Sequence, residues 1–465
     1  MFILMLVIFV LGYAAIALEH PLKVDKAASA LLIGVLTWTI YVLNGHTILD
    51  LGFSVNWNDL IAGGQEDHNI YHFIRHELEH HLVEIASILF FLLGAMTIVE
   101  VVDRHGGFRI ITDKIKTLNK VKLLWIFSIL TFFMSAALDN LTTTIVMLAL
   151  IRKVMADKED KWFFASMVVL ASNAGGAWSP IGDVTTIMLW IGVQITAQRI
   201  IVDTILPSLV TMLVPVIIMS FFMKGDVKPA VAETHDDDNG ESISDGQRNL
   251  IFALGVASLL FVPVFKTVTH LPPYMGMLLG LGNMWLVTEL ILKKKSAAFK
   301  KKYNVIGIIK HVDVATVFFF LGILTAVAAL QSAGHLAILA GYLDENLGNI
   351  YAINIAIGML SAIVDNVPLV AGAMGMYDVF TPEMLQSLNP ADAAYYSEFM
   401  QDGNFWKFLA FCAGTGGSIL IIGSAAGVAA MGIEKIDFIW YMKRISLLAF
   451  IGYISGAFTY WLMFA

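Results

Sequence analysis

The chain has 465 residues, of which 58% are hydrophobic and only 14% are charged, and its mean hydropathy is +0.76. These values exclude an ordinary soluble domain and predict a membrane protein. The single cysteine, Cys412, excludes an intrachain disulfide, and the net charge of −8 includes no basic patch that would indicate nucleic acid as a partner.

Eight apolar runs are long enough to form simple membrane-spanning helices, because a hydrocarbon core of about 30 Å needs roughly 20 helical residues. The first run lacks the charged n-region and the cleavage site of a signal peptide, so we interpret it as a retained helix. The eight runs lie near 2–18, 27–43, 84–102, 200–222, 248–265, 274–292, 312–330 and 438–463. We therefore expect an all-α polytopic membrane protein.

A histidine stripe precedes the third apolar run. His68, His72, His76 and His80 recur at four-residue spacing, followed by His81, which predicts one solvated face of a short helix outside the membrane. The segment His76-Glu77-Leu78-Glu79-His80 also fits the H-E-x-x-H pattern of zinc proteases. A membrane zinc protease is therefore one alternative, and pH sensing or adventitious metal binding by the stripe is another.

Charged residues also mark the two ends of the third apolar run, at Glu84, Glu100 and His105. Such residues commonly anchor a helix in the membrane interface. A role in proton access or in the response to pH is the alternative, with Glu100 as the leading candidate because of its more buried position.

Four further apolar regions carry polar clusters at their centres, which a simple helix in lipid would not tolerate. We expect re-entrant helical hairpins at 123–151 and 350–378. The regions 162–197 and 405–431 contain clustered glycines, and the first also contains Pro180, so each is predicted to be a broken helix.

The placement of Lys and Arg predicts the orientation in the membrane. The basic residues at 23–26, 104–122, 152–161, 224–228, 293–302 and 443–444 are expected to be cytoplasmic. The segments 44–82, 332–349 and 379–404, together with both termini, are expected outside. This arrangement requires the two hairpins to enter from opposite sides.

The chain divides into two similar halves, 1–223 and 248–465, joined by a hydrophilic cytoplasmic linker at 224–247. Phe90–Val99 matches Phe319–Val327, and Ser135–Leu141 matches Ser361–Val367 at nearly the same offset. Because the matching helices run in opposite directions through the membrane, the halves are predicted to be inverted repeats, with a site at the midplane between them.

Asp139 and Asp365 each lie in the middle of an apolar stretch, where an unpaired carboxylate is costly by a few to about 10 kcal/mol. Either a bound cation or a bound proton removes that cost, so the two ligands compete for one site. Competition of this kind is the physical basis of antiport.

Polar residues around these two acids supply the oxygen ligands that hard cations prefer. We place Na⁺ or Li⁺ at Asp139, Asn140, Asp365 and Asn366, and expect no structural metal. Two alternatives are that each Asp only caps a helix and that the glycines only allow close helix packing. The full set of predicted cation- and proton-binding residues is Asp139, Asn140, Thr142, Asn173, Asp183, Thr185, Thr186, Asp365, Asn366, Thr415, Ser418 and Ser424.

The segments 84–100, 135–144, 172–186 and 361–372 closely resemble NhaD-type sodium/proton antiporters of the ion transporter superfamily. The resemblance implies a secondary transporter, with no catalytic residues and no cofactor, that exchanges Na⁺ or Li⁺ for H⁺ by alternating access. We expect a homodimer surrounded by lipid in a bacterial inner membrane. Related dicarboxylate and arsenite carriers share this architecture, so an anion transporter is the alternative; clustered carboxylates would repel a dianion, which disfavours it.

Overall fold

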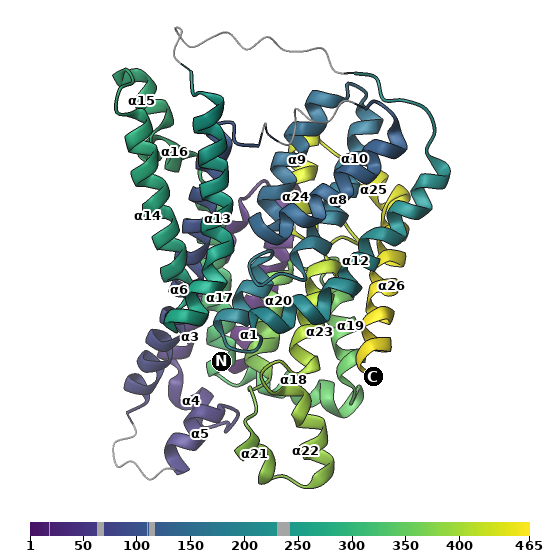
Figure 1. Cartoon of the computed structure of the whole chain (residues 1–465). Coiled ribbons are helices and arrows are strands. Elements are labelled where there is room, and N and C mark those ends of the chain that lie inside the picture. Colours follow the sequence, from purple (N-terminus) through teal and green to yellow (C-terminus); the bar gives the residue numbers. More distant parts are fainter. Residues whose placement is uncertain (18, 63–68, 109, 111–116, 230–241) are drawn as a thin grey trace.

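The computed structural model of the chain is a bundle of helices that lie roughly along one common direction (Figure 1). It describes residues 1–17, 19–62, 69–108, 110, 117–229 and 242–465. Within these ranges there is no strand, only isolated bridges. His68 and most of the predicted linker, residues 230–241, lie outside the described residues.

Eight helices of the described chain are long and apolar enough to cross a membrane, so the predicted all-α polytopic class is confirmed. Seven of them correspond to predicted spanning runs. The run 2–18 instead forms a shorter helix, α1 (Phe2–Ala17), and the eighth long helix belongs to a predicted hairpin. The eight are α3 (Lys26–Leu43), α6 (Ile70–Arg104), α8 (Lys120–Leu138), α12 (Ala197–Phe222), α13 (Asp245–Thr269), α14 (Pro273–Leu292), α17 (Val314–Ser332) and α26 (Ser446–Phe464).

The helix α6 corrects one prediction. The described histidines of the stripe do not form a separate short helix, because α6 begins at Ile70 and continues without interruption to Arg104. No proline lies in this range, and Asn69 caps the helix by accepting hydrogen bonds from the backbone of Tyr71 and His72. Thirty-five residues extend about 52 Å, which exceeds a hydrocarbon core of about 30 Å.

Each of the four regions with a central polar cluster forms two helices joined by a short segment. The arms α8 and α9 (Asn140–Val154) meet at Asp139, and the arms α19 (Ile350–Leu360) and α20 (Asn366–Met376) meet at residues 361–365. The helix α10 (Lys158–Gly176) is separated from α11 (Val184–Ile191) by an irregular segment, and α23 (Asn404–Gly416) is separated from α24 (Ala425–Glu434) in the same way.

The two hairpins open toward opposite ends of the molecule. The amide of Lys120 donates to the carbonyl oxygen of Gly225, so α8 begins beside the end of α12. The hydroxyl of Tyr351, in the first turn of α19, instead donates to the carbonyl oxygen of Phe464 near the C-terminus. Figure 1 shows the same relationship, since residues 224–229 after α12 lie at one end and the C-terminal end of α26 lies in the other half of the molecule.

Short helices cover both ends of the bundle (Figure 1). The end that includes α15 (Ala297–Tyr303) and α16 (Val305–Ile308) also carries the described parts of the linker, residues 224–229 and 242–247, and we call it the linker end. We call the opposite end the α4 end, and both termini lie in the half of the molecule nearer to it. It carries α4 (Gly45–Leu49), α5 (Val55–Ala62), α18 (His335–Asn346), α21 (Pro382–Gln386) and α22 (Pro390–Tyr396).

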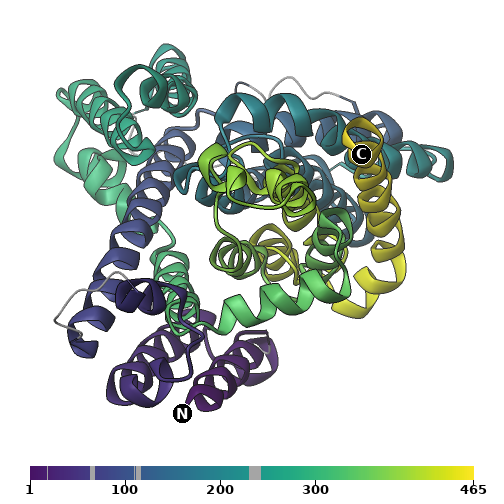
Figure 2. The ribbon, with the colours of Figure 1, turned by 90° about the horizontal axis from the view of Figure 1, so that it is seen from below.

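Seen along the bundle, the helices form two groups that lie side by side (Figure 2). The framework group consists of α1, α3, α6, α13, α14 and α17, which pack mainly on one another. The core group contains both hairpins and both broken helices, together with α12 and α26. The groups meet where α6 and α17 contact α11 and α20.

Candidate functional site

Asp183 lies where the first broken helix resumes. It is the N-cap of α11, and its Oδ1 accepts hydrogen bonds from the backbone N–H of Thr185 at 2.9 Å and from the Thr185 hydroxyl at 2.9 Å. The residue is only 1% exposed. The chain can reach this position because Gly176 and Gly182 pack in close contact, so that a Cβ on Gly176 would lie 2.5 Å from the carbonyl oxygen of Gly182.

Both hairpins direct an amide at this one carboxylate. The Nδ2 of Asn140, the first residue of α9, donates to Oδ2 of Asp183 at 2.5 Å. The Nδ2 of Asn366, the first residue of α20, donates to the same carboxylate at 3.2 and 3.3 Å. Both asparagines are buried. Asp183 therefore joins the tips of two hairpins that lie 226 residues apart in the sequence (366 minus 140).

A second set of hydrogen bonds links the two halves through Asn173 on α10. Its Oδ1 accepts from Asn140 at 3.1 Å, and its Nδ2 donates to the hydroxyls of Ser418 and Ser424, each at 2.9 Å. Seven of the predicted residues consequently form one buried network: Asn140, Asn173, Asp183, Thr185, Asn366, Ser418 and Ser424.

Ser424 occupies in the second broken helix the position that Asp183 has in the first. Its backbone angles, φ −145° and ψ 155°, nearly equal the φ −145° and ψ 149° of Asp183, and it caps α24 through the N–H of Gly427. A Cβ on Gly417 would lie 2.7 Å from the carbonyl oxygen of Gly423. The corresponding distance from a Cβ on Gly176 to the carbonyl oxygen of Gly182 is 2.5 Å, so both breaks bring two glycines into close contact. The two breaks thus share their backbone geometry but differ in charge.

Asp139 has an unusual backbone conformation, with φ 85° and ψ 160°. This region is almost reserved for glycine and costs about 1–3 kcal/mol for other residues, which retain it mainly at functional positions. Its carboxylate accepts from the backbone N–H of Thr142 at 2.7 Å and from the Thr142 hydroxyl at 2.8 Å. The capping role considered from the sequence is therefore present in α9.

Asp365 also caps its helix, and in addition it has a basic partner that the sequence analysis missed. Its Oδ1 accepts from the N–H of Val367 at 3.2 Å, and its Oδ2 lies 3.7 Å from Nζ of Lys26 on α3. The same Nζ lies 4.4 Å from the centre of the Phe319 ring on α17. The sequence analysis uses Lys26 only to predict the orientation of the chain in the membrane. Its position in the first turn of an apolar helix is the feature that could have indicated an acidic partner.

The other predicted residues lie outside the network or contribute only locally. Thr186 donates to the carbonyl oxygen of Asp183, and Thr415 donates to Phe411 within its own helix. Glu100 pairs with Arg104 at 2.8 Å, and Nδ1 of His105 lies 2.7 Å from the carbonyl oxygen of Val101. Glu84 lies 3.5 Å from His81 near the α4 end, so Glu84, Glu100 and His105 are not part of the Asp183 network.

Two pockets approach the network from opposite ends. The Asp365 pocket is lined by Tyr13, Glu19, Lys26 and Asp365 and continues into a groove with Asp25, Asp313 and Thr316. It lies at the beginning of α3, away from α4. The His81 pocket lies toward the α4 end and is lined by side chains of α6, α11, α17 and α20 and by the segment between α11 and α12. Its lining includes His81, Glu84, Met188, Gln194, Leu324 and Met374.

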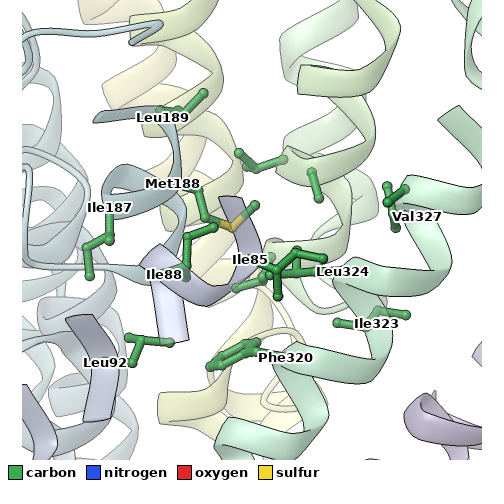
Figure 3. Packing of buried hydrophobic residues seen from close by; sticks show 14 of the residues in the cluster. Ile85, Ile88, Leu92, Ile187, Met188, Leu189, Phe320, Ile323, Leu324 and Val327 are labelled. Atoms are coloured by element: carbon green, nitrogen blue, oxygen red, sulfur yellow. The ribbon is translucent and has the colours of Figure 1, made fainter. Parts of the chain in front are cut away.

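An apolar cluster borders the His81 pocket, and its members Ile85, Ile88, Met188, Leu324 and Val327 also line that pocket. In the close-up of Figure 3, the α6 side chains face those of α17, and Ile187 and Met188 of α11 lie on the α6 side of the cluster. Ile187 directly follows Thr185 and Thr186. The cluster therefore includes residues of the helix that Asp183 caps.

A comparison with known protein families matches residues 3–397 to the family described as "Citrate transporter". The chain belongs to this family. Sodium/proton antiporter 1 of Arabidopsis thaliana is 43% identical to it over 460 residues, which are 98% of this chain and 71% of that protein, and sodium/proton antiporter 2 of the same plant is 39% identical over 98% of both. The Na(+)/H(+) antiporter NhaD of Vibrio cholerae is 30% identical over 94% of this chain and 87% of its own length. These relatives confirm the resemblance to NhaD-type sodium/proton antiporters.

Membership of this family makes the chain a transporter and not an enzyme. The H-E-x-x-H segment has no protease geometry either. Glu77 is buried and accepts a hydrogen bond from Asn56, whereas His76 and His80 are exposed on another face of α6. The ligand cluster found among the described residues contains His80 but not His76, and the Glu77 carboxylate is already used by Asn56.

Proposed function

We propose that the protein exchanges Na⁺ or Li⁺ for H⁺, and that Asp183 is the carboxylate for which the metal ion and the proton compete. The supporting observation is the hydrogen bonding of Asp183 to both Asn140 and Asn366, which lie at the tips of the two hairpins. The sequence analysis gave this central role to Asp139 and Asp365. In the revised proposal these two acids flank Asp183 and interact with its charge.

Burial supports competition at Asp183. Its side-chain partners are neutral amides and a hydroxyl, and none of the ion pairs within the described residues includes Asp183 or Asp139. A carboxylate anion held this way in a membrane protein is costly unless a positive charge joins it. A metal cation or a proton supplies that charge, and each excludes the other.

The surrounding groups are suited to a hard cation. The helices α8, α10, α19 and α23 all end at the hairpin tips or helix breaks, so their carbonyl ends carry partial negative charge toward this region. Asn140 and Asn366 donate to Asp183 here, but a half-turn of each amide group would present Oδ1 instead. Together with Thr185, these groups would form the all-oxygen shell that Na⁺ and Li⁺ favour.

Alternating access completes the proposal. We propose that ions reach the site through the Asp365 pocket in this conformation, and that the apolar cluster of Figure 3 blocks access from the α4 end. Movement of the core group past the framework group would close the site to the linker end and open it to the α4 end.

We propose that the halves are inverted repeats, and the similar backbone geometry of Asp183 and Ser424 supports this proposal. We also propose that the hairpins are re-entrant and that the linker end is cytoplasmic. We further propose a homodimer in a bacterial inner membrane, with both termini outside.

The family description makes transport of a carboxylate anion such as citrate the alternative. Two lysines of the bundle are already paired with acids. Lys26 lies beside Asp365, and Lys407 on α23 donates to Asp203 at 2.7 Å. A polyanion entering the Asp365 pocket would therefore meet carboxylates and a lysine that already has an acidic partner, which favours cation exchange.

The decisive experiment compares Asp183→Asn with the wild type in everted vesicles from cells that lack other antiporters. Loss of Na⁺- and Li⁺-dependent dequenching of a ΔpH dye is expected, with normal amounts of protein in the membrane. Asp437→Asn is the matched control, because Asp437 is an exposed helix cap on α25 (Phe438–Arg444). Full exchange by Asp183→Asn would reject the site, and citrate uptake without Na⁺/H⁺ exchange by the wild type would reject the function.

A further inference from the structure

A second group of ligating side chains lies about 100 residues before Asp183, on α6. His80, His81 and Glu84 each offer one ligand atom, and these atoms all lie within 4.8 Å of one another. Glu84 lies one helical turn after both histidines, which is why all three side chains gather on one side of the helix. Nδ1 of His81 is 3.5 Å from Oε2 of Glu84, and the two imidazole rings have centroids 5.7 Å apart.

An independent observation comes from Gln194, which lies between α11 and α12. Gln194 is only 7% exposed, and its Oε1 has no hydrogen-bond partner. A buried acceptor without a partner is uncommon and costs about 1–3 kcal/mol. Gln194 lines the His81 pocket together with His81 and Glu84, so the residue with the unpartnered acceptor borders the same pocket as the ligand cluster.

We propose that His80, His81 and Glu84 bind one divalent transition-metal ion of the Zn²⁺ class, with the amide oxygen of Gln194 accepting from a metal-bound water or binding as the fourth ligand. Two imidazoles and a carboxylate with an open fourth position suit Zn²⁺, whereas the transported alkali cations prefer oxygen ligands. Ligands at zinc lie about 3.4 Å apart, given bonds of about 2.0–2.1 Å. Rotation of the exposed His80 and Glu84 side chains closes the remaining gap.

This metal site has a consequence for exchange. The three protein ligands belong to the framework group, and Gln194 belongs to the segment between two helices that pack on the core group. A metal ion held between them restrains the His81 pocket, so Zn²⁺ acting from the α4 end inhibits exchange. Inhibition rests on the proposed function, but metal binding does not.

Binding is measured on the purified full-length protein in detergent, by calorimetric titration with ZnCl₂ and by the visible absorption of Co²⁺ as a zinc substitute. The wild type is expected to bind one ion per chain. His80→Ala and His81→Ala are each expected to weaken binding at least about tenfold, the lower limit of losses seen when even an outer-shell partner is removed. His80 is exposed, so its substitution leaves folding intact even if that of the buried His81 does not.

His76→Ala is the matched control, because His76 is exposed on the same helix one turn before His80. It is expected to bind Zn²⁺ as the wild type does. Absence of binding by the wild type, equal binding by the wild type and His80→Ala, or loss of binding in His76→Ala without loss in His81→Ala would overturn the assignment.

Inhibition is then measured in proteoliposomes with the α4 end facing the added ZnCl₂. Exchange by the wild type is expected to fall as Zn²⁺ is added. Half-inhibition of His80→Ala is expected to require a Zn²⁺ concentration at least about tenfold higher, in line with its loss of affinity for the metal. Equal inhibition of both proteins would reject the regulatory role. Absence of exchange by either protein without Zn²⁺ would instead count against the proposed function, while the binding result would stand.

Discussion

Lys26 and Asp365 connect the two groups of helices, because the Nζ of Lys26 on α3 lies 3.7 Å from Oδ2 of Asp365 at the start of α20. The lysine is in the framework group and the acid is in the core group. Both side chains line the Asp365 pocket, so a cation entering there meets a carboxylate that already has a positive partner. The ion pair must be weakened before Asp365 can contribute to cation binding.

Replacement of Lys26 by Gln is therefore expected to lower the KM for Na⁺. A partly exposed ion pair is worth up to about 1 kcal/mol, which corresponds to about a fivefold change. The measurement is the Na⁺ dependence of dye dequenching in everted vesicles. Lys23→Gln is the control, because Lys23 is exposed near the same end of α3, and an unchanged KM in Lys26→Gln would show that the pair does not compete with the ion.

Asn140 is expected to be more important for exchange than Asn366. It donates to Asp183 at 2.5 Å and also to Asn173, whereas Asn366 reaches Asp183 at 3.2–3.3 Å without a second partner of this kind. Asn140→Ala is expected to reduce the exchange rate at least about tenfold, the effect of losing one strong hydrogen bond to a charged group. Asn366→Ala is expected to reduce it less. Equal rates in the two variants, or the reverse order, would contradict this reading of the network.

Two substitutions of Asp139 distinguish the contribution of its carboxylate to exchange from the contribution of its strained backbone to stability. Asp139→Gly removes the carboxylate and relieves a backbone conformation that costs about 1–3 kcal/mol. The same substitution also removes a helix cap that stabilises the protein by about 1 kcal/mol. Asp139→Asn keeps both the strain and a capping oxygen. Both variants are expected to lose exchange, and the glycine variant is expected to unfold at a temperature no lower than the asparagine variant. A much lower unfolding temperature for Asp139→Gly would show that φ 85° carries no strain.

Asp203 and Lys407 are expected to contribute to stability rather than to transport. They form a buried ion pair between α12 and α23, with both side chains 7% exposed. Asp203→Asn leaves the lysine charge unpaired and is expected to lower the free energy of unfolding by about 3–5 kcal/mol. Thermal unfolding in detergent measures this loss. The double variant Asp203→Asn/Lys407→Met is expected to recover much of it, and no recovery would mean that the pair is not the cause.

Local backbone chemistry explains why the sequence predicts so much of the fold. Long apolar runs require helices in a bilayer, and glycine clusters interrupt them, so α10 ends at Gly176 and α23 ends at Gly416. The one helix-boundary error with functional importance is α6. Its polar first turns look like an extramembrane segment, but His, Glu and Arg are compatible with an uninterrupted helix.

The sequence by itself determined the all-helical architecture and the set of polar residues available inside it. Only the tertiary structure decided that Asp183 lies between Asn140 and Asn366, that Lys26 pairs with Asp365, and that Gln194 shares a pocket with His81. The physical reason is the distance along the chain over which each interaction acts. Helix propensity, capping and breaking act over a few neighbouring residues, whereas these contacts join helices that are far apart in the chain and depend on how their side chains meet across the bundle.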